Sequence, residues 1–151
     1  MSKGWITVWK NDVLLVDKHN ITTNSGIEAL VKTMTNYGGY ASYVDSMEIG
    51  TGTNPATPTD TALQSLYNGI VGANANGGTS VSVALATTTV SNDTAVFTAK
   101  FKIGSTAPSS PITEAGLFFN DATPTMIARQ VFDGITVLSN DIITVAWSIQ
   151  L

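Results

Sequence analysis

The sequence contains no cysteine. This absence excludes disulfide scaffolds, thiolate-bound zinc, iron–sulfur clusters and cysteine nucleophiles. A chain of 151 residues does not need such crosslinks, because at this length roughly two-thirds of the surface of the unfolded chain is buried on folding. We therefore expect one domain, residues 1–151, with a single hydrophobic core.

Charged residues are also scarce. They make up 12 % of the chain, against roughly a quarter in an average domain, and the 7 basic residues form no cluster. With a net charge of −4 and no basic patch to neutralise phosphates, the composition argues against nucleic acid as a partner. Thr, Ser, Asn and Gly take the place of charge, which suits surfaces that meet, because few charges must be desolvated there.

Long apolar runs are absent as well. None approaches the roughly 18 to 20 residues needed to cross a bilayer. The first residues lack the basic and apolar regions of a secretory signal. We therefore expect a protein that is made in the cytosol and has no membrane partner.

Most apolar residues recur with period two, the pattern of half-buried strands. The clearest alternation lies in residues 94–103, 143–151 and 80–85. Shorter strands are expected at 5–10, 13–17, 46–50, 112–120, 125–132 and 135–138, with turns at Asn11-Asp12, Asn92-Asp93, Asp133-Gly134 and Asn140-Asp141. These eight or nine strands predict a mainly β fold, an antiparallel β-sandwich or jelly-roll-like domain.

One segment has helical period. Ser25 and Glu28 have the spacing of a capping box, in which each side chain satisfies a free backbone N–H of the first turn. An apolar stripe then follows at Ile27, Leu30, Val31 and Met34. Gly38-Gly39 supplies the stop. We expect a helix of about three turns near residues 25–36, lying across one end or face of the sandwich.

Two stretches have neither period. Residues 51–63 are rich in Thr and Pro and have almost no apolar side chain, so we interpret them as either a fixed functional loop or a mobile one. The candidate contact residues of this loop are Thr51, Asn54, Pro55, Thr57, Pro58 and Asp60. Residues 69–79 are rich in Gly and Asn and are expected to form a flexible or exposed loop.

Candidates for catalysis and for metal or phosphate binding are weak. His19 is the only histidine; Asp17 could polarise it from the same strand face, or His19 could simply end a strand in solvent. The acidic residues do not follow a calcium-loop pattern, and Gly50-Thr51-Gly52 lacks the residues of a phosphate loop. We therefore predict no catalytic residue, no metal site and no cofactor.

Glu114 and Arg129, the only arginine, form the one charged pair that the pattern singles out. Glu114 lies on an apolar strand face, and the next strand carries Arg129. If residues 120–123 form the turn, Glu114 lies opposite Arg129. We hypothesise a cross-strand ion pair that fixes the register of this hairpin. A catalytic Glu/Arg pair is the functional alternative.

A series of short motifs runs along nearly the whole chain. They are NITTNSG at 20–26, MEIGTGTNP at 47–55, DTAL at 60–63, ITEAGLFF at 112–119, MIAR at 126–129 and WSIQL at 147–151. Their order resembles small structural proteins of tailed bacteriophages, which occur as capsid cement (decoration) proteins or as tail and tail-fibre modules. The resemblance implies a β-sandwich or jelly roll that works as an oligomer, with no catalytic residues.

Three functions follow as expectations. The first is a virion surface protein, made in the host cytoplasm, that stabilises the capsid by bridging major capsid proteins as a trimer or dimer. The second is a tail, baseplate or short tail-fibre component that uses Tyr37, Tyr40 and Tyr43 as aromatic contacts, although these could equally pack in the core or a loop. The third is a small glycan-acting enzyme, which would need a carboxylate pair or a His19-centred site.

Overall fold

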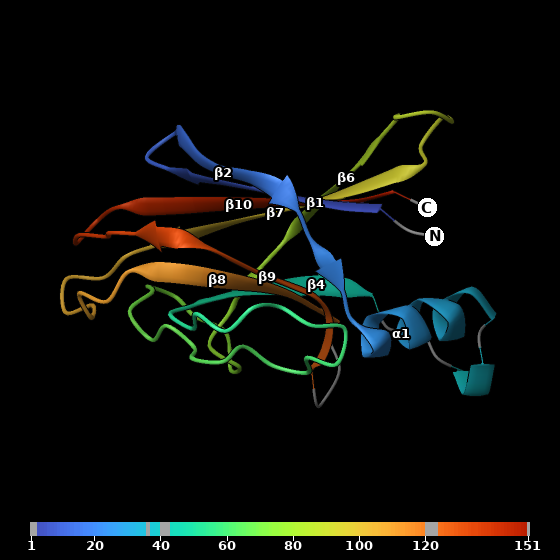
Figure 1. Ribbon diagram of the computed structural model, residues 1–151, viewed down its shortest axis with the longest axis horizontal. Coiled ribbons are helices and arrows are strands. Elements are labelled where there is room, and N and C mark those ends of the chain that lie inside the picture. The colour runs from blue at the N-terminus through green and yellow to red at the C-terminus, as the bar shows by residue number, and fades with distance from the viewer. Residues whose placement is uncertain (1–2, 36, 40–42, 120–123, 151) are drawn as a thin grey trace.

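The computed structural model describes residues 3–35, 37–39, 43–119 and 124–150. Within them the chain forms ten strands, one α-helix and one short 3₁₀ turn. The strands build two antiparallel sheets that lie face to face, with the helix at one end (Figure 1). The predicted mainly β sandwich with one short helix is therefore confirmed.

Each sheet contains five strands. The first sheet has the order β2-β1-β10-β7-β6, and its strands are β1 Lys3–Lys10, β2 Val13–His19, β6 Ser82–Ala86, β7 Thr94–Lys102 and β10 Ile142–Gln150. The second sheet has the order β3-β9-β8-β4-β5, and its strands are β3 Ile21–Thr22, β4 Val44–Gly50, β5 Thr79–Ser80, β8 Ile112–Phe119 and β9 Thr125–Ile135.

The core lies between the sheets and follows the period-two pattern of the sequence. Alternate residues of β10 and β7 point inward from the first sheet, and alternate residues of β8 and β4 point inward from the second. The largest of these buried side chains include Trp147, Phe101, Phe119, Leu117, Met47 and Ile49. This alternation is why the strand positions could be predicted so closely from sequence.

Three of the four predicted turns are present. Asn11 and Asp12 both have positive φ, 48° and 68°, the signature of a type I′ hairpin between β1 and β2. Asn92 and Asn140 also take positive φ at their turns. The fourth prediction is wrong, because 133–134 lie inside β9, which runs on beside β8 until Ile135 pairs with Ile112.

Helix α1, Asn24–Thr35, lies close to its predicted position, but the capping prediction is wrong. The cap is Thr23, whose Oγ1 accepts a hydrogen bond from the Gly26 N–H at 3.1 Å. Thr23 is held by β9, since its hydroxyl donates to the Met126 carbonyl at 2.6 Å. Glu28 pairs instead with Lys32 at 2.7 Å. The sheet therefore decides where the helix begins.

The face that α1 buries also differs from the predicted stripe. Gly26 and Ala29 are buried against β9, and a Cβ on Gly26 would lie 2.5 Å from the Ile127 carbonyl oxygen. Ile27 and Val31 are exposed. Leu30, a further member of the predicted stripe, is half-buried and packs against the core. The stripe is therefore correct at Leu30 and wrong at Ile27 and Val31, because the helix approaches β9 so closely at Gly26 that small residues occupy that contact.

Candidate functional site

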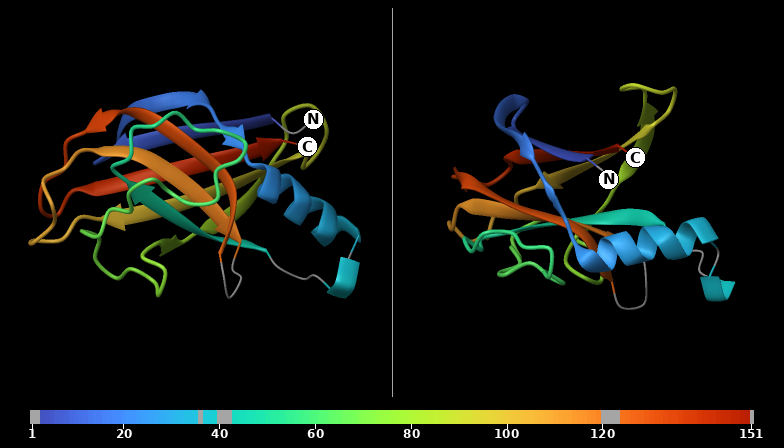
Figure 2. Two further views of the ribbon diagram at one scale, coloured as in Figure 1. Left: turned by 60° about the horizontal axis from the view of Figure 1, so that its bottom comes forward. Right: turned by 45° about the vertical axis from the view of Figure 1, so that its right-hand side comes forward.

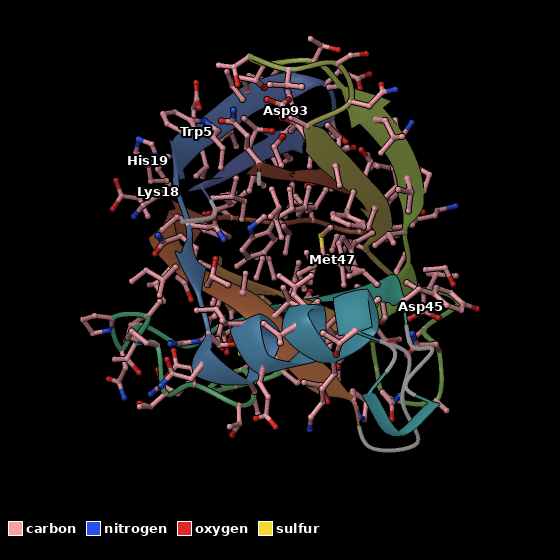
Figure 3. The ribbon with its side chains drawn as sticks, turned by 90° about the vertical axis from the view of Figure 1, so that its right-hand side faces the viewer. Trp5, Lys18, His19, Asp45, Met47 and Asp93 are labelled. Atoms are coloured by element: carbon pink, nitrogen blue, oxygen red, sulfur yellow. The ribbon has the colours of Figure 1, made fainter. Side chains whose placement is uncertain are left out.

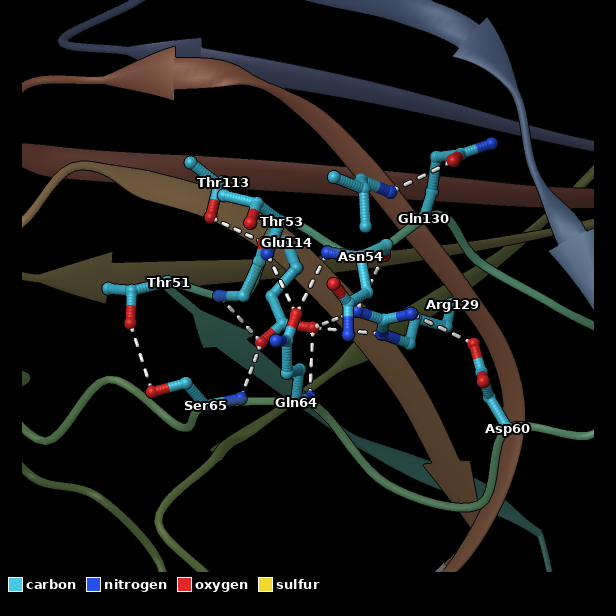
Figure 4. Close-up of polar contacts among 12 residues, drawn as sticks. Thr51, Thr53, Asn54, Asp60, Gln64, Ser65, Thr113, Glu114, Arg129 and Gln130 are labelled. Carbon is cyan, nitrogen blue, oxygen red and sulfur yellow. Dashed lines mark hydrogen bonds and ion pairs between the residues drawn. The ribbon is translucent and has the colours of Figure 1, made fainter.

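Glu114 of β8 and Arg129 of β9 form a buried ion pair on the outer side of the second sheet. The Glu114 side chain is 0 % exposed and that of Arg129 is 3 % exposed. Arg129 Nε and Nη2 each lie 2.8 Å from Glu114 Oε2, so two donors of the guanidinium converge on one carboxylate oxygen. The predicted ion pair is present (Figure 4).

The register predicted for this pair is wrong. Glu114 lies opposite Val131, and Arg129 lies opposite Gly116, so the two charged residues are diagonal neighbours. Phe119 pairs with Thr125 and not with residue 124, and the pairing shifts by a further residue at an irregularity between Leu117 and Phe118. Such a bulge leaves no residue pattern that would reveal the shift. Long side chains bridge a diagonal offset, which explains why the contact forms nonetheless.

The remaining acceptor sites of Glu114 bind the loop at 51–66. Oε1 accepts the backbone N–H groups of Gly52 at 3.0 Å and Ser65 at 2.8 Å, and Oε2 accepts that of Gln64 at 3.1 Å. The first and last parts of the loop are thereby attached to one buried carboxylate. Sequence reasoning missed Gln64 and Ser65, because they contribute backbone N–H groups, which every residue except proline carries.

Arg129 holds the middle of the same loop. Its Nη1 lies 2.9 Å from Asp60 Oδ2, and its Nη2 donates to the Asn54 carbonyl at 3.2 Å. Partial burial acts to raise the pKa of the Asp60 carboxyl, but hydrogen bonds from the Thr57 N–H and from Arg129 outweigh it and hold the pKa below its ordinary value. Asp60 is therefore a charged partner of Arg129.

Two glycines make room for this carboxylate. A Cβ on Gly50 would lie 2.6 Å from Glu114 Oε1, and a Cβ on Gly52 would lie 2.5 Å from the same oxygen. The sequence Gly50-Thr51-Gly52, which lacks the residues of a phosphate loop, thus allows close approach of the backbone to a buried anion.

The loop of candidate contact residues is therefore the fixed one of the two alternatives. Thr51 is half-buried and its hydroxyl donates to Ser65 Oγ at 3.1 Å. Asp60 points inward to Arg129 (Figure 4). The other four predicted contact residues are exposed on the outer surface: Asn54, Pro55, Thr57 and Pro58.

A second carboxylate, Glu48 of β4, shares the environment of Glu114. It is half-buried beside Gly116, and desolvation together with the charge of Glu114 raises its pKa to about 7. Glu114 itself is enclosed, and its two oxygens accept the bonds of Arg129 and of three backbone N–H groups. The arrangement stabilises a loop and leaves Glu114 inaccessible to a substrate.

His19 ends β2 and is exposed, in agreement with the simpler of its two interpretations. Its ring meets that of Trp5 edge-on, with 4.0 Å between the centroids and 69° between the planes. Asp17 accepts a hydrogen bond from the Trp5 indole N–H. No hydrogen bond joins Asp17 and His19 among the residues described, so the structure does not contain the polarised pair.

Within the described part of the chain, the other acidic residues do not gather into a metal centre. The residues described contain no group of three or more His, Asp or Glu side chains that could hold a metal ion. A cavity of about 570 Å³ lies between β2 and β9, and Asp17 and Asp133 are among its lining residues. Lys18, which also lines it, donates a hydrogen bond to the Val131 carbonyl at 2.9 Å.

In the described part of the chain, no helix has the length and hydropathy required to span a membrane.

The tyrosine segment is only partly described. Tyr43 is 65 % exposed. The side chain of Tyr37, which begins the 3₁₀ turn Tyr37–Gly39, and the whole of Tyr40 lie outside the described residues. The role of the three rings as aromatic contacts therefore stays a prediction.

An apolar face is uncovered at β6, the edge strand of the first sheet. Val83 and Leu85 lie opposite Phe97 and Ala95 of β7 and so point toward the interior side of the sandwich. Yet they are 56 % and 63 % exposed, because the second sheet does not extend beneath β6. A cavity of about 190 Å³ opens beside them and is lined mainly by Leu85, Phe97, Ile149, Leu30, Val44 and Ile127.

Comparison with family models, with curated proteins and with solved structures finds no match to this chain. Its function must therefore be argued from its residues and their geometry.

Proposed function

We propose that this chain is a non-enzymatic structural protein of a tailed-phage virion, a decoration protein that binds the major capsid lattice as a homo-oligomer. The sequence motifs support this proposal through their resemblance to such proteins. The observation that carries it is the uncovered apolar face of β6, which is the kind of surface that a neighbouring subunit covers.

Strand β6 supports self-association in two ways. It pairs only with β7, so among the described residues its other edge has no strand beside it. Antiparallel pairing with β6 of a second copy would continue the first sheet across a two-fold axis. The same pairing brings Val83 and Leu85 of both copies together and removes their apolar surface from water.

The loop at 51–66 supports a second, separate contact with the capsid. Its exposed residues Asn54, Pro55 and Pro58 carry no charge, and the loop beneath them is fixed by Glu114 and Arg129. A fixed loop loses little conformational entropy when it docks. In a dimer two such loops engage the lattice together, which multiplies a modest affinity.

Cosedimentation with capsids of the phage that encodes the chain, prepared without this protein, tests the proposal. We expect saturable binding that is lost in the double variant Asn54→Asp, Pro55→Asp. The matched control is Ala73→Asp with Ala75→Asp, which adds the same charge to another exposed loop and should bind normally. No binding by the natural chain, or equal loss in both variants, would contradict the lattice contact.

A tail, baseplate or short tail-fibre component is the second candidate. The observation that favours it is the exposed ring of Tyr43, because exposed aromatic residues are frequent anchors of interfaces. Chains that bind purified tails and not capsids would favour this candidate over a decoration protein.

A further inference from the structure

A separate cleft lies on the outer face of the first sheet, opposite the interior side toward which Val83 and Leu85 of β6 point, and away from the loop at 51–66. It has a volume of about 240 Å³ and is lined by Trp5, His19, Thr88, Ser148 and Gln150 among others. The β1–β2 and β6–β7 hairpins rise on either side of β10 (Figure 2). Trp5 and His19 of the first hairpin and Thr88 and Thr94 of the second line the cleft.

The aromatic wall of this cleft is held in place before any ligand arrives. Trp5 is 38 % exposed, yet its indole N–H donates to Asp17 and its ring is braced edge-on by His19 at 4.0 Å. Figure 3 shows Trp5 and His19 together on the outer side of the first sheet. A fixed aromatic face binds a ligand with little loss of side-chain entropy.

The polar groups of the cleft are neutral hydrogen-bonding groups. The hydroxyl of Ser148, on the strand that pairs with Trp5, has no hydrogen-bond partner within the described residues. Gln150 Nε2 donates to Thr89 Oγ1 at 3.2 Å and to Asp93 Oδ2 at 3.0 Å, which orients its amide and leaves the carbonyl oxygen as an acceptor.

The charge of the cleft restricts what it binds. No Lys or Arg is among its described lining residues, so it lacks the cations that recognise phosphate or carboxylate groups. A purely apolar ligand would leave the Ser148 hydroxyl and the side-chain carbonyl oxygen of Gln150 without partners. A ligand with one apolar C–H face and several hydroxyl groups satisfies both the indole ring and the polar rim.

We propose that this cleft binds a neutral sugar ring, such as a terminal residue of a glycan. The C–H face of the sugar packs on Trp5, and its hydroxyls bond to Ser148, Gln150 and the imidazole of His19. The backbone of Gly4 also lines the cleft. This binding activity is separate from the proposed attachment to a capsid and from the contacts made by β6.

The test is a two-dimensional NMR titration of the whole protein with the methyl glycosides of glucose, galactose, mannose and N-acetylglucosamine. We expect at least one glycoside to shift the indole N–H signal of Trp5 and the backbone amides of Ser148 and Gln150. Trp5→Ala should weaken that glycoside at least tenfold, whereas Trp5→Phe, which keeps a ring, should retain part of the affinity.

Trp9 provides the matched control. It lies on the same face of β1, about 13 Å from Trp5 by strand rise, and lines a different cleft with Asp12 and Lys100. Trp9→Ala should leave the glycoside affinity unchanged. The thermal melting of each variant shows whether it is folded.

Three results would overturn the proposal. They are the absence of shifts with all four glycosides, equal affinity in Trp5→Ala and the natural chain, and equal loss of affinity in Trp9→Ala. Adenosine serves as a further probe because a nucleobase also stacks on an aromatic ring. Adenosine binding at Trp5 tighter than that of every glycoside would likewise overturn the assignment to sugars.

Discussion

Glu114 of β8 and Arg129 of β9 are diagonal neighbours in the second sheet and form a buried ion pair. The further hydrogen bonds of these two side chains hold the loop at 51–66, to which neither residue belongs. The Glu114 carboxylate accepts hydrogen bonds from backbone N–H groups at both ends of the loop. The Arg129 guanidinium donates hydrogen bonds to Asp60 and to the Asn54 carbonyl in the middle of the loop. A segment with few apolar side chains is therefore held by a polar anchor (Figure 4), in addition to the packing of half-buried Leu63 over Gly116 of β8.

Glu114→Gln should destabilise the protein by about 3 to 5 kcal/mol, because it leaves a buried guanidinium without its charged partner. Combined with Arg129→Lys in a double-mutant cycle, it should show strong coupling, measured by urea unfolding at pH 7. Glu28→Gln, which breaks the exposed pair with Lys32, is the control and should change little. Additive effects of the Glu114 and Arg129 variants would contradict the hypothesis that the pair holds β8 and β9 in register.

Gly52→Ala should cost about 1 to 3 kcal/mol through overpacking, because the added Cβ would lie 2.5 Å from Glu114 Oε1. Gly104→Ala is the comparison, since no atom lies closer than 3.3 Å to its Cβ position. Urea unfolding of both variants measures the difference. Equal, small effects would show that the loop yields without disturbing the carboxylate.

Glu48→Gln should stabilise the protein above neutral pH. Because the folded-state pKa of Glu48 is raised to about 7 from 4.5, the natural protein binds an extra proton between these values and loses stability as pH rises through that window. The variant lacks this loss, so it should exceed the natural protein by about 1 kcal/mol at pH 8, after allowance for solvent screening of a half-buried group. The advantage should vanish near pH 4.

Thermal unfolding at pH 4, 6 and 8 measures this effect. Asp60, whose pKa is lowered, acts in the opposite direction at lower pH, but it is present in both proteins and cancels in the comparison. A stability difference that is independent of pH would contradict the raised pKa of Glu48.

Leu85→Asp should abolish self-association, because it places a charge in the face that the second copy of β6 covers. Analytical ultracentrifugation over a range of concentrations should show the natural chain forming dimers and the variant remaining monomeric. Val90→Asp, in the exposed turn beyond β6, is the control and should still dimerise. A natural chain that stays monomeric, or that forms trimers only, would contradict pairing through β6.

The strands were predictable where one face of the strand is buried in the core and the other face is exposed to solvent. In β10 and β7, inward residues such as Trp147 and Phe101 alternate with Ser148 and Lys100, and the predicted bounds are accurate to one residue. In β8 all eight residues from Ile112 to Phe119 are buried, because the core lies on one side and the loop at 51–66 covers the other. Because the loop at 51–66 has no apolar periodicity, the sequence does not indicate that it covers the outer face of β8.

Helix packing and register escaped prediction for different reasons. Ile27 and Val31 have the spacing of a buried stripe, but a close contact at Gly26 turns the smaller side chains of α1 toward β9. The partners of Glu114 in the loop are backbone N–H groups, which carry no residue-type signal. What could be predicted was that an isolated charge on an apolar strand needs a counter-charge, and Arg129 was the only arginine available.

Immunogold labelling of intact virions with an antibody to this chain tests the proposed function most directly. We predict gold spread over the head, at many sites on each particle, as expected for a protein bound throughout the capsid lattice. Gold confined to the tail or its tip would contradict a decoration protein and favour the tail component, and particles without any gold would contradict both.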